Sequence, residues 1–70
     1  MITQANFVKI SFFYRIDKKP TILIMPQLEF NKNIQRFVSR KGIYKYNNTK
    51  VDLTIVNKIH IEFFSDVAAY

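Results

Sequence analysis

The fold is decided by residues 30–51, FNKNIQRFVSRKGIYKYNNTKV, because this stretch contains the only helical pattern in the chain. Three apolar residues spaced three and four apart predict one apolar helical face. They are Ile34, Phe37 and Val38. Asn31 is suited to the N-cap, and Gly42, the only glycine, is suited to the position after the helix. We therefore predict a helix over residues 31–41 whose apolar face packs on a sheet.

The same stretch carries the whole net charge of the protein. Six of the eleven Lys and Arg residues lie in it, and none of the five Asp and Glu residues does. The other five basic residues are balanced by the five acidic ones, so the formal net charge of +6 belongs to residues 30–51. A negatively charged partner is therefore expected to bind here.

Nucleic acid is the first candidate for that partner. Lys32, Arg36 and Arg40 repeat every four residues on the helix face opposite the apolar one, with about 6 Å between successive turns. Such a row can follow a phosphate backbone, and aromatic residues between cations can stack on bases. The candidate binding residues are Lys32, Arg36, Arg40, Lys41, Lys45, Lys50, Tyr44 and Tyr46. The alternative is an ordinary solvated helix face, although solvated faces commonly mix the two signs of charge.

The residues before the helix predict a β-hairpin. Every second residue from Val8 to Ile16 is apolar, which predicts a strand with this set facing the core. Residues 17–20 form a turn signal that ends in proline, and the β-branched and aliphatic residues 21–25 predict a second, antiparallel strand. Pro26 is expected to end that strand.

The residues after the helix predict two more strands. Residues 43–47 form the first, and the Asn-rich residues 47–50 form a turn. Apolar residues then fall on odd positions from Val51 to Phe63, which predicts one long strand over residues 51–64 with a bulge or bend near Asn57 and Lys58. A hairpin that turns at the same place is the alternative.

These elements predict a single α+β domain over residues 1–70, in the order β-β-α-β-β. The simplest packing is a four-stranded antiparallel sheet with one helix packed on one face. Residues 1–5 and 65–70 contain no pattern that assigns them to an element, which leaves loose termini as the interpretation for both.

A second function follows from the sheet face that the helix does not cover. The side chains expected there are Phe7, Phe13 and Val56, with Leu23 and Met25 as further candidates. An open apolar face favours a homodimer or a partner protein, and a terminal strand can extend another sheet through its edge. Half of the chain consists of residues with AT-rich codons, which is typical of phages and plasmids of low-GC bacteria. In that setting the domain is expected to bind and inhibit a host protein, with residues 30–51 meeting an acidic protein surface.

Other function classes have little support. The chain has one His and no Cys, so neither a catalytic triad nor a zinc site is expected, and one Gly excludes a glycine-rich phosphate loop. His60 and Glu62, which share a strand face with Lys58, are interpreted as solvated residues rather than an acid–base pair. We therefore expect no enzyme, no metal, no cofactor and no small-molecule substrate. No apolar run reaches the roughly 20 residues of a membrane span, and no signal peptide is recognisable, so a cytoplasmic location is expected.

Overall fold

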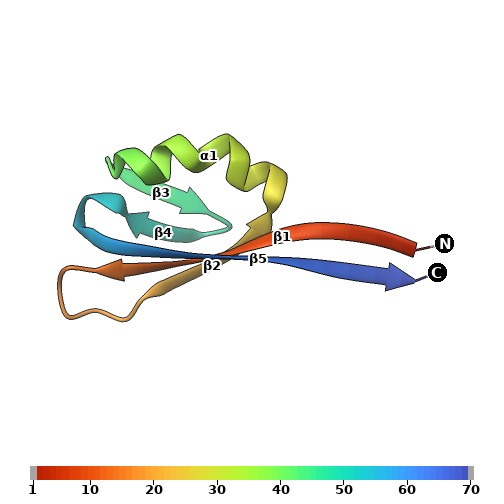
Figure 1. Ribbon diagram of the computed structural model, residues 1–70. Coiled ribbons are helices and arrows are strands. Elements are labelled where there is room, and N and C mark those ends of the chain that lie inside the picture. The colour runs from red at the N-terminus through yellow and green to blue at the C-terminus, as the bar shows by residue number, and fades with distance from the viewer. Residues whose placement is uncertain (1, 70) are drawn as a thin grey trace.

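A computed structural model describes the backbone of residues 2–69 and the side chains of residues 6–65. It contains one α-helix, one short 3₁₀ helix and two antiparallel sheets (Figure 1). The elements are β1 (Ile2–Tyr14), β2 (Thr21–Pro26), α1 (Gln27–Ser39), β3 (Ile43–Tyr46), β4 (Thr49–Asp52), η1 (Leu53–Ile55) and β5 (Val56–Ala69). The α+β class and the antiparallel pairing are thus confirmed.

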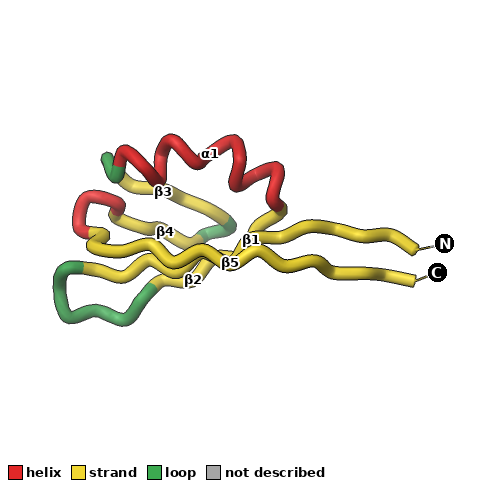
Figure 2. Tube along the Cα trace, in the orientation of Figure 1, coloured by secondary structure: helices red, strands yellow, loops and turns green. Residues whose placement is uncertain are grey.

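The strands do not form the single four-stranded sheet that was predicted. β2, β1 and β5 form a three-stranded sheet in that spatial order, and β3 and β4 form a separate two-stranded hairpin. Figures 1 and 2 show α1 and the hairpin on the same side of the three-stranded sheet. The hairpin and α1 therefore cover one face of the three-stranded sheet together, and the opposite face is left open.

The core face of the sheet follows the alternation of β1. Val8, Ile10 and Phe12 are fully buried, as predicted, and β2 places Met25 and Leu23 opposite the first two of them. Cross-strand neighbours point to the same face, so Leu23 and Met25 belong to the core and not to the open face. Ile16 does not continue the core set, because β1 ends at Tyr14 and the Ile16 side chain is 55% exposed.

The helix begins four residues earlier than predicted. Pro26 is the N-cap residue, with φ −59° and ψ 146°, and Asn31 is an exposed residue inside the helix. Proline suits this boundary because its ring fixes φ in a range that both extended and helical backbone tolerate. At the other end Arg40, rather than the predicted Lys41, ends the helix with a left-handed backbone, φ 54° and ψ 42°.

The earlier start brings Phe30 into the helix, and the buried face of α1 is centred on Phe30 and Phe37 instead of Ile34, Phe37 and Val38. Phe30 and Phe37, two helical turns apart, are each 3% exposed, whereas Ile34 is 40% and Val38 69% exposed. Phe37 packs edge-on against Phe12 of β1, with ring centroids 5.7 Å apart, and against Tyr44 of β3 at 4.9 Å. Two aromatic rings bury more apolar area than Ile34 and Val38 would, which explains the rotation.

The predicted strand over residues 51–64 is wrong, because the chain turns within it. β4 ends at Asp52, and the 3₁₀ turn η1 follows. The Asp52 carboxylate accepts a hydrogen bond from the Thr54 N–H at 3.1 Å, and the Arg15 guanidinium donates to the Thr54 carbonyl at 2.6 Å. Leu53 is fully buried inside this turn. The run of odd apolar residues therefore spans three different elements, β4, η1 and β5.

The alternative turn at Asn57 and Lys58 is also absent, but the predicted bulge is present there. Phe13 of β1 pairs with Lys58, and Tyr14 pairs with Val56, so Asn57 has no partner across the β1–β5 ladder. The extra residue changes which side of β5 faces the core. Val56 points into the core with Tyr14, and after the bulge the odd residues from Ile59 onward take that side.

β1 and β5 extend beyond the rest of the molecule as a two-stranded ribbon (Figure 1). Their pairing runs from Tyr14 and Val56 to Ile2 and Ala69, and the molecule measures 46 × 22 × 20 Å. The termini were expected to be loose, but the backbone of residues 2–5 and 65–69 is paired. Residues 1 and 70 lie outside the described part of the chain.

Candidate functional site

Two of the three cations in the predicted row, Arg36 and Arg40, make contacts with different elements of the fold. The Arg36 guanidinium donates to the carbonyl of Ile43 at 3.0 Å and lies 5.7 Å from the ring centroid of Tyr44. This contact joins α1 to β3. Arg36 is exposed, but its guanidinium is directed at the hairpin rather than along the axis of the helix.

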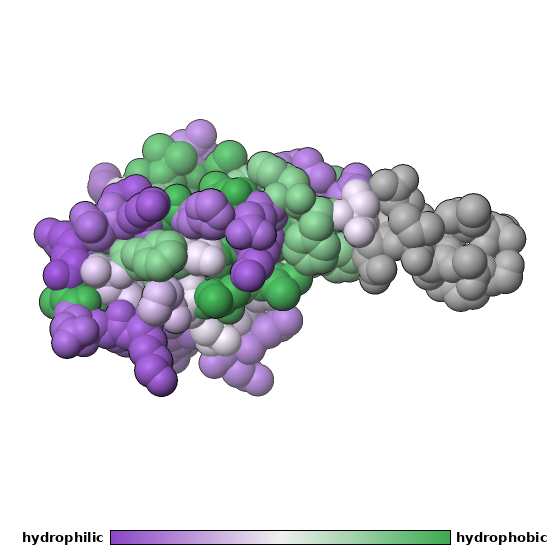
Figure 3. Space-filling view, turned by 60° about the horizontal axis from the view of Figure 1, so that its bottom comes forward, coloured by the Kyte–Doolittle hydropathy of each residue, from purple (hydrophilic) through white to green (hydrophobic). Residues whose placement is uncertain are grey.

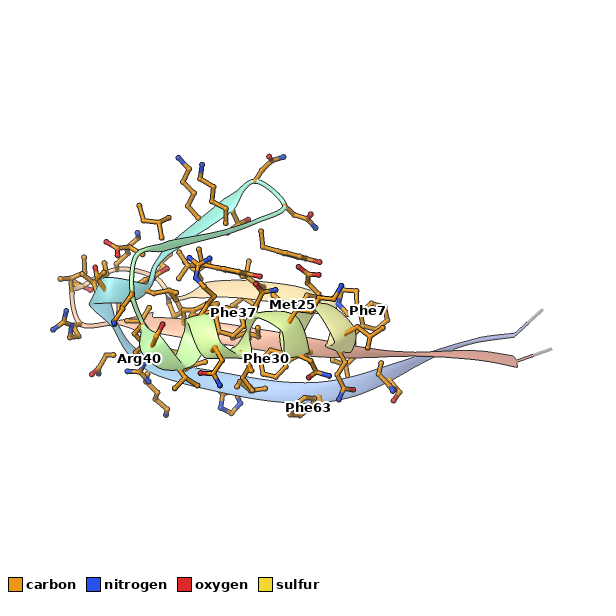
Figure 4. All side chains as sticks on the ribbon, turned by 90° about the horizontal axis from the view of Figure 1, so that it is seen from above. Phe7, Met25, Phe30, Phe37, Arg40 and Phe63 are labelled. Atoms are coloured by element: carbon orange, nitrogen blue, oxygen red, sulfur yellow. The ribbon has the colours of Figure 1, made fainter. Side chains whose placement is uncertain are left out.

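Arg40 joins α1 to the other side of the molecule. Its guanidinium donates to the carbonyl of Asn57 at 3.1 Å and makes a longer contact, 3.5 Å, with the carbonyl of Val56. Figure 4 shows Arg40 at the end of α1, above the start of β5. Arg36 and Arg40 thus reach toward different elements, and with Lys32 they do not form a straight row.

The remaining predicted cations are exposed. Lys32 and Lys41 make no hydrogen bond or ion pair within the described residues. Lys45 and Lys50 lie directly opposite each other on the outer face of the β3–β4 hairpin. With Tyr46 and the two turn residues they surround a hollow of about 330 Å³. This hairpin end is the place where the structure brings predicted binding residues together.

The turn of the hairpin explains its shape. Asn47 and Asn48 both have positive φ, 45° and 65°, as a two-residue hairpin loop of the I′ type requires. Asparagine tolerates this backbone, so the predicted turn is confirmed at residues 47 and 48, whereas residues 49 and 50 belong to β4. Tyr46 is half-buried beside it.

Tyr44 is unsuited to base stacking. Its side chain is 4% exposed and packs between Phe37 and the Arg36 guanidinium. Burial raises the pKa of the Tyr44 hydroxyl, the charges of Glu29 and Tyr46 raise it further, and Arg36 acts in the opposite direction. Tyr44 is therefore a neutral core residue.

Two of the three predicted interface residues lie on the open sheet face. Phe13 is 38% exposed, and Phe7 stacks on Phe64 with ring centroids 5.7 Å apart. Val56 is 4% exposed and belongs to the core. Ile22 and Ile24 of β2 were missed, although the alternation within β2 could have assigned them to this face, since both are more than half exposed. Figure 3 shows hydrophobic and hydrophilic side chains interleaved on the side turned forward there.

A more continuous apolar surface lies between α1 and β5, and sequence reasoning missed it. It is a groove of about 560 Å³. The residues that line it are Phe30, Ile34, Phe37, Val38, Arg40, Ile59 and Ile61. Phe63 continues it along β5, with its ring 5.9 Å from that of Phe30 and 60% of its surface exposed. The groove depends on the rotation of α1, which no local pattern reveals.

The outer edge of β5 forms one rim of this groove. β5 is an edge strand of the three-stranded sheet, so every second N–H and C=O group along it points away from β1. β2 forms the other edge, but it has six residues and ends in proline, whereas β5 has fourteen residues and no proline. Arg40 occupies carbonyls of residues 56 and 57, so the accessible edge begins at Lys58.

One close pair of titratable side chains lies on β5. Among the side chains of residues 6–65, the His60 imidazole and the Glu62 carboxylate on β5 lie 3.2 Å apart, within hydrogen-bond distance. Both side chains are about half exposed, at 52% and 56%. Across the described part of the chain, no three residues of the types His, Cys, Asp and Glu are grouped closely enough to hold a metal ion.

Comparison with known proteins adds no relative. No protein-family model, no curated protein and no solved structure matches this chain. Within residues 2–69, no helix is both long enough and apolar enough to span a membrane.

Proposed function

We propose that this chain is a non-enzymatic protein-interaction module that binds its partner through the outer edge of β5 and the adjoining groove. One observation carries the proposal: the outer edge of β5, the longer of the two edge strands, is unpaired and borders an apolar groove. Natural proteins normally protect such an edge with proline, with a bulge or with a covering element. Here the bulge at Asn57 and the cover from Arg40 protect its first residues, and the edge beyond them is open.

The strand edge and the groove contribute to the free energy of binding in different ways. A partner strand that pairs with the edge forms main-chain hydrogen bonds with it, and every second side chain of that strand points into the groove. Four exposed hydrophobic residues border that strand position. They are Ile34, Val38, Ile61 and Phe63, with exposed fractions of 40%, 69%, 38% and 60%. A partner that covers them gains roughly 25 cal/mol for each Å² of apolar surface removed from water.

Two matched substitutions test the proposal. Ile61 on the groove side and Phe13 on the open face are both 38% exposed. Each protein is immobilised, and the proteins that it retains are measured, including soluble copies of the chain itself. We expect Ile61→Glu to abolish the retention that wild type shows. We expect Phe13→Glu to leave retention unchanged, and circular dichroism checks that both variants are folded. Equal retention by all three proteins, or retention by none, contradicts the proposal.

Contact with a nucleic-acid backbone is a second candidate, favoured by the Lys45–Lys50 pair. Like charges directly opposite each other destabilise a hairpin, by roughly 0.2–1 kcal/mol, unless an anion lies between them. A phosphate group would supply that anion. Such binding would weaken steeply as salt is raised, because it releases counterions from the nucleic acid.

The charge pair gives this second candidate its own test. Lys50→Glu replaces the like-charged pair by an opposite one, so the free energy of unfolding is expected to rise by roughly 0.2–1 kcal/mol in urea titrations. Affinity for single- or double-stranded oligonucleotides should fall in the same variant. Lys19→Glu, an equal charge change in the exposed β1–β2 loop, is the control. Equal affinity of the two variants at low salt would exclude the hairpin as a phosphate site.

A further inference from the structure

The partner that best fits the edge of β5 is a second copy of the same strand. Resting on the function proposed above, we infer that two chains associate through antiparallel β5–β5 pairing about a two-fold axis at Ile61. The three-stranded sheets of the two copies then join into one sheet of six strands, in the order β2-β1-β5-β5-β1-β2. Such an interface is isologous, which is the commonest symmetry of homodimers.

The groove side of this pairing is apolar throughout. A two-fold axis perpendicular to the sheet keeps the same face of both copies on the same side, and paired residues point to that side together. Ile61 then lies opposite Ile61 of the second copy, and Ile59 lies opposite Phe63 of that copy. The Phe63 ring, which is 60% exposed in one chain, gains an apolar neighbour at the rim of the groove.

The other side of the pairing brings hydrogen-bonding and cation–aromatic partners together. His60 of each copy lies opposite Glu62 of the other, in addition to the contact of 3.2 Å that these two side chains make within one chain. Lys58 lies opposite Phe64, a combination already seen in the chain, where the Lys58 ammonium is 5.9 Å from the centroid of the Phe13 ring. Such cation–aromatic contacts are favourable when the cation approaches the ring face.

Neighbouring two-fold registers are less favourable. With the axis at Glu62, two carboxylates meet directly, and like charges opposite each other are destabilising. With the axis at His60, two imidazoles meet and Phe63 lies opposite Asn57, whose carbonyl is held by Arg40. The axis at Ile61 keeps the paired residues 58–64 clear of the carbonyls that Arg40 occupies.

The distribution of charge also favours self-association at this edge. The formal net charge of +6 belongs to residues 30–51, so two copies repel each other most strongly where these residues approach each other. Residues 58–64 contain one Lys, one Glu and the single His, so their formal charges cancel at pH 7 with His neutral. Figure 4 shows the β3–β4 hairpin, which carries Lys45 and Lys50, on the side of the molecule away from β5. The pairing segments therefore add no net formal charge of their own to the interface.

Disulfide trapping tests the register, because the chain has no cysteine of its own. Residues directly opposite in antiparallel strands have Cα atoms about 4.5–5.5 Å apart, which suits a disulfide. We expect Ile61→Cys to give a covalent dimer on mild oxidation. Ile43→Cys, on the outer face of β3 and 57% exposed, should stay monomeric. A dimer trapped equally by both variants, or by His60→Cys and not by Ile61→Cys, overturns the register.

A charge exchange keeps the inference testable should the disulfide distort the strand. His60→Glu places carboxylates opposite each other at two symmetric positions, so the dimer dissociation constant should rise roughly tenfold. Adding Glu62→Lys restores opposite charges and should recover most of that loss. A second substitution that recovers nothing contradicts the pairing of residues 60 and 62.

Light scattering during size exclusion measures the mass of the protein in solution. This mass distinguishes the homodimer inferred here from the proposed interaction module on which the inference rests. A dimer in wild type and Phe13→Glu and a monomer in Ile61→Glu support both. A wild-type monomer at every concentration that still retains a protein, in a manner sensitive to Ile61→Glu, overturns the homodimer and leaves the interaction module standing. A wild-type monomer that retains nothing overturns both.

Discussion

At the scale of single residues, Arg40 ends α1 with a left-handed backbone and connects that end to the start of β5. Its backbone has φ 54°, a left-handed conformation that costs a residue other than glycine roughly 1–2 kcal/mol. Its guanidinium donates to carbonyls at the start of β5. The left-handed backbone directs the side chain from the end of α1 toward that strand. The backbone cost is thus offset by hydrogen bonds between two elements, and the same contact limits the open edge.

Two substitutions at residue 40 separate the backbone from the side chain. Arg40→Ala loses the guanidinium and keeps the backbone cost, so the free energy of unfolding should fall by about 1–2 kcal/mol. Arg40→Gly loses the same bonds but removes the left-handed penalty, so its loss should be smaller by about 1 kcal/mol. Urea titration of the three proteins measures both differences. A glycine variant less stable than the alanine variant contradicts this account of Arg40.

Asp52 gives the fold a dependence on pH. Hydrogen bonds from Thr54, first from its hydroxyl and then from its N–H, hold the pKa of the Asp52 carboxyl below its ordinary value of 3.8. A carboxyl whose folded pKa is lowered contributes stability above the ordinary value, and this contribution is lost as the pH falls through the folded value. Asp52→Ala should therefore lower the Tm at pH 7, and the difference from wild type should shrink below pH 3.8.

The control for this prediction is Asp17→Ala. Asp17 is exposed in the β1–β2 loop, and it makes no hydrogen bond or ion pair in the part of the chain that the structure describes. Its substitution should change the Tm little at either pH. A difference between Asp52→Ala and wild type that stays constant from pH 7 to pH 2 would show that the Thr54 contact does not depend on the charge of Asp52.

At the scale of elements, the orientation of α1 decides where the groove lies. Phe37 touches Phe12, Phe30 and Tyr44, whereas Val38 lines the groove and is 69% exposed. Phe37→Ala should cost about 3–5 kcal/mol, close to the whole stability of a domain of this size. Val38→Ala should cost no more than about 0.5 kcal/mol in a dilute monomer. Urea titration would contradict the orientation if Val38→Ala were the more damaging change.

Much of this element structure follows from local sequence. The alternation of β1 predicts its core face, and Asn47 with Asn48 predicts the hairpin turn. The helix start was missed because Pro26 was taken as the end of a strand, whereas it is also the N-cap of α1. The turn at Leu53 was missed because a 3₁₀ turn that buries every second residue imitates the period of a strand.

The candidate site was less predictable than the fold. Sequence spacing placed Lys32, Arg36 and Arg40 in a row, but spacing does not show which carbonyls a guanidinium will reach. Arg36 donates to the carbonyl of Ile43, 7 residues further along the chain, and Arg40 donates to the carbonyl of Asn57, 17 residues further along. The groove requires the relative placement of α1 and β5, which is set by the packing of Phe30 and Phe37. The sequence did allow a terminal strand to extend another sheet through its edge, but it gave no sign of the groove beside that edge.

At the scale of the whole molecule, charge and apolar surface are separated. The β3–β4 hairpin carries the opposed lysines, and the groove between α1 and β5 carries the exposed hydrophobic residues (Figure 4). A dimer through β5 would leave both basic hairpins at its outer sides, free to meet a negatively charged surface. The basic stretch and the apolar edge can therefore serve one assembly, in which β5 forms the dimer and the hairpins steer it toward anionic partners.

The most direct measurement of the central claim is amide hydrogen exchange along β5, followed by NMR in wild type, Ile61→Glu and Phe13→Glu. Every second amide of residues 58–64 points away from β1 and is open to water in a single chain. We predict that these amides exchange roughly tenfold more slowly in wild type and Phe13→Glu than in Ile61→Glu, because one pairing strand is worth more than 1.4 kcal/mol. Equal exchange rates at these amides in all three proteins would contradict the claim that the edge of β5 is the binding surface.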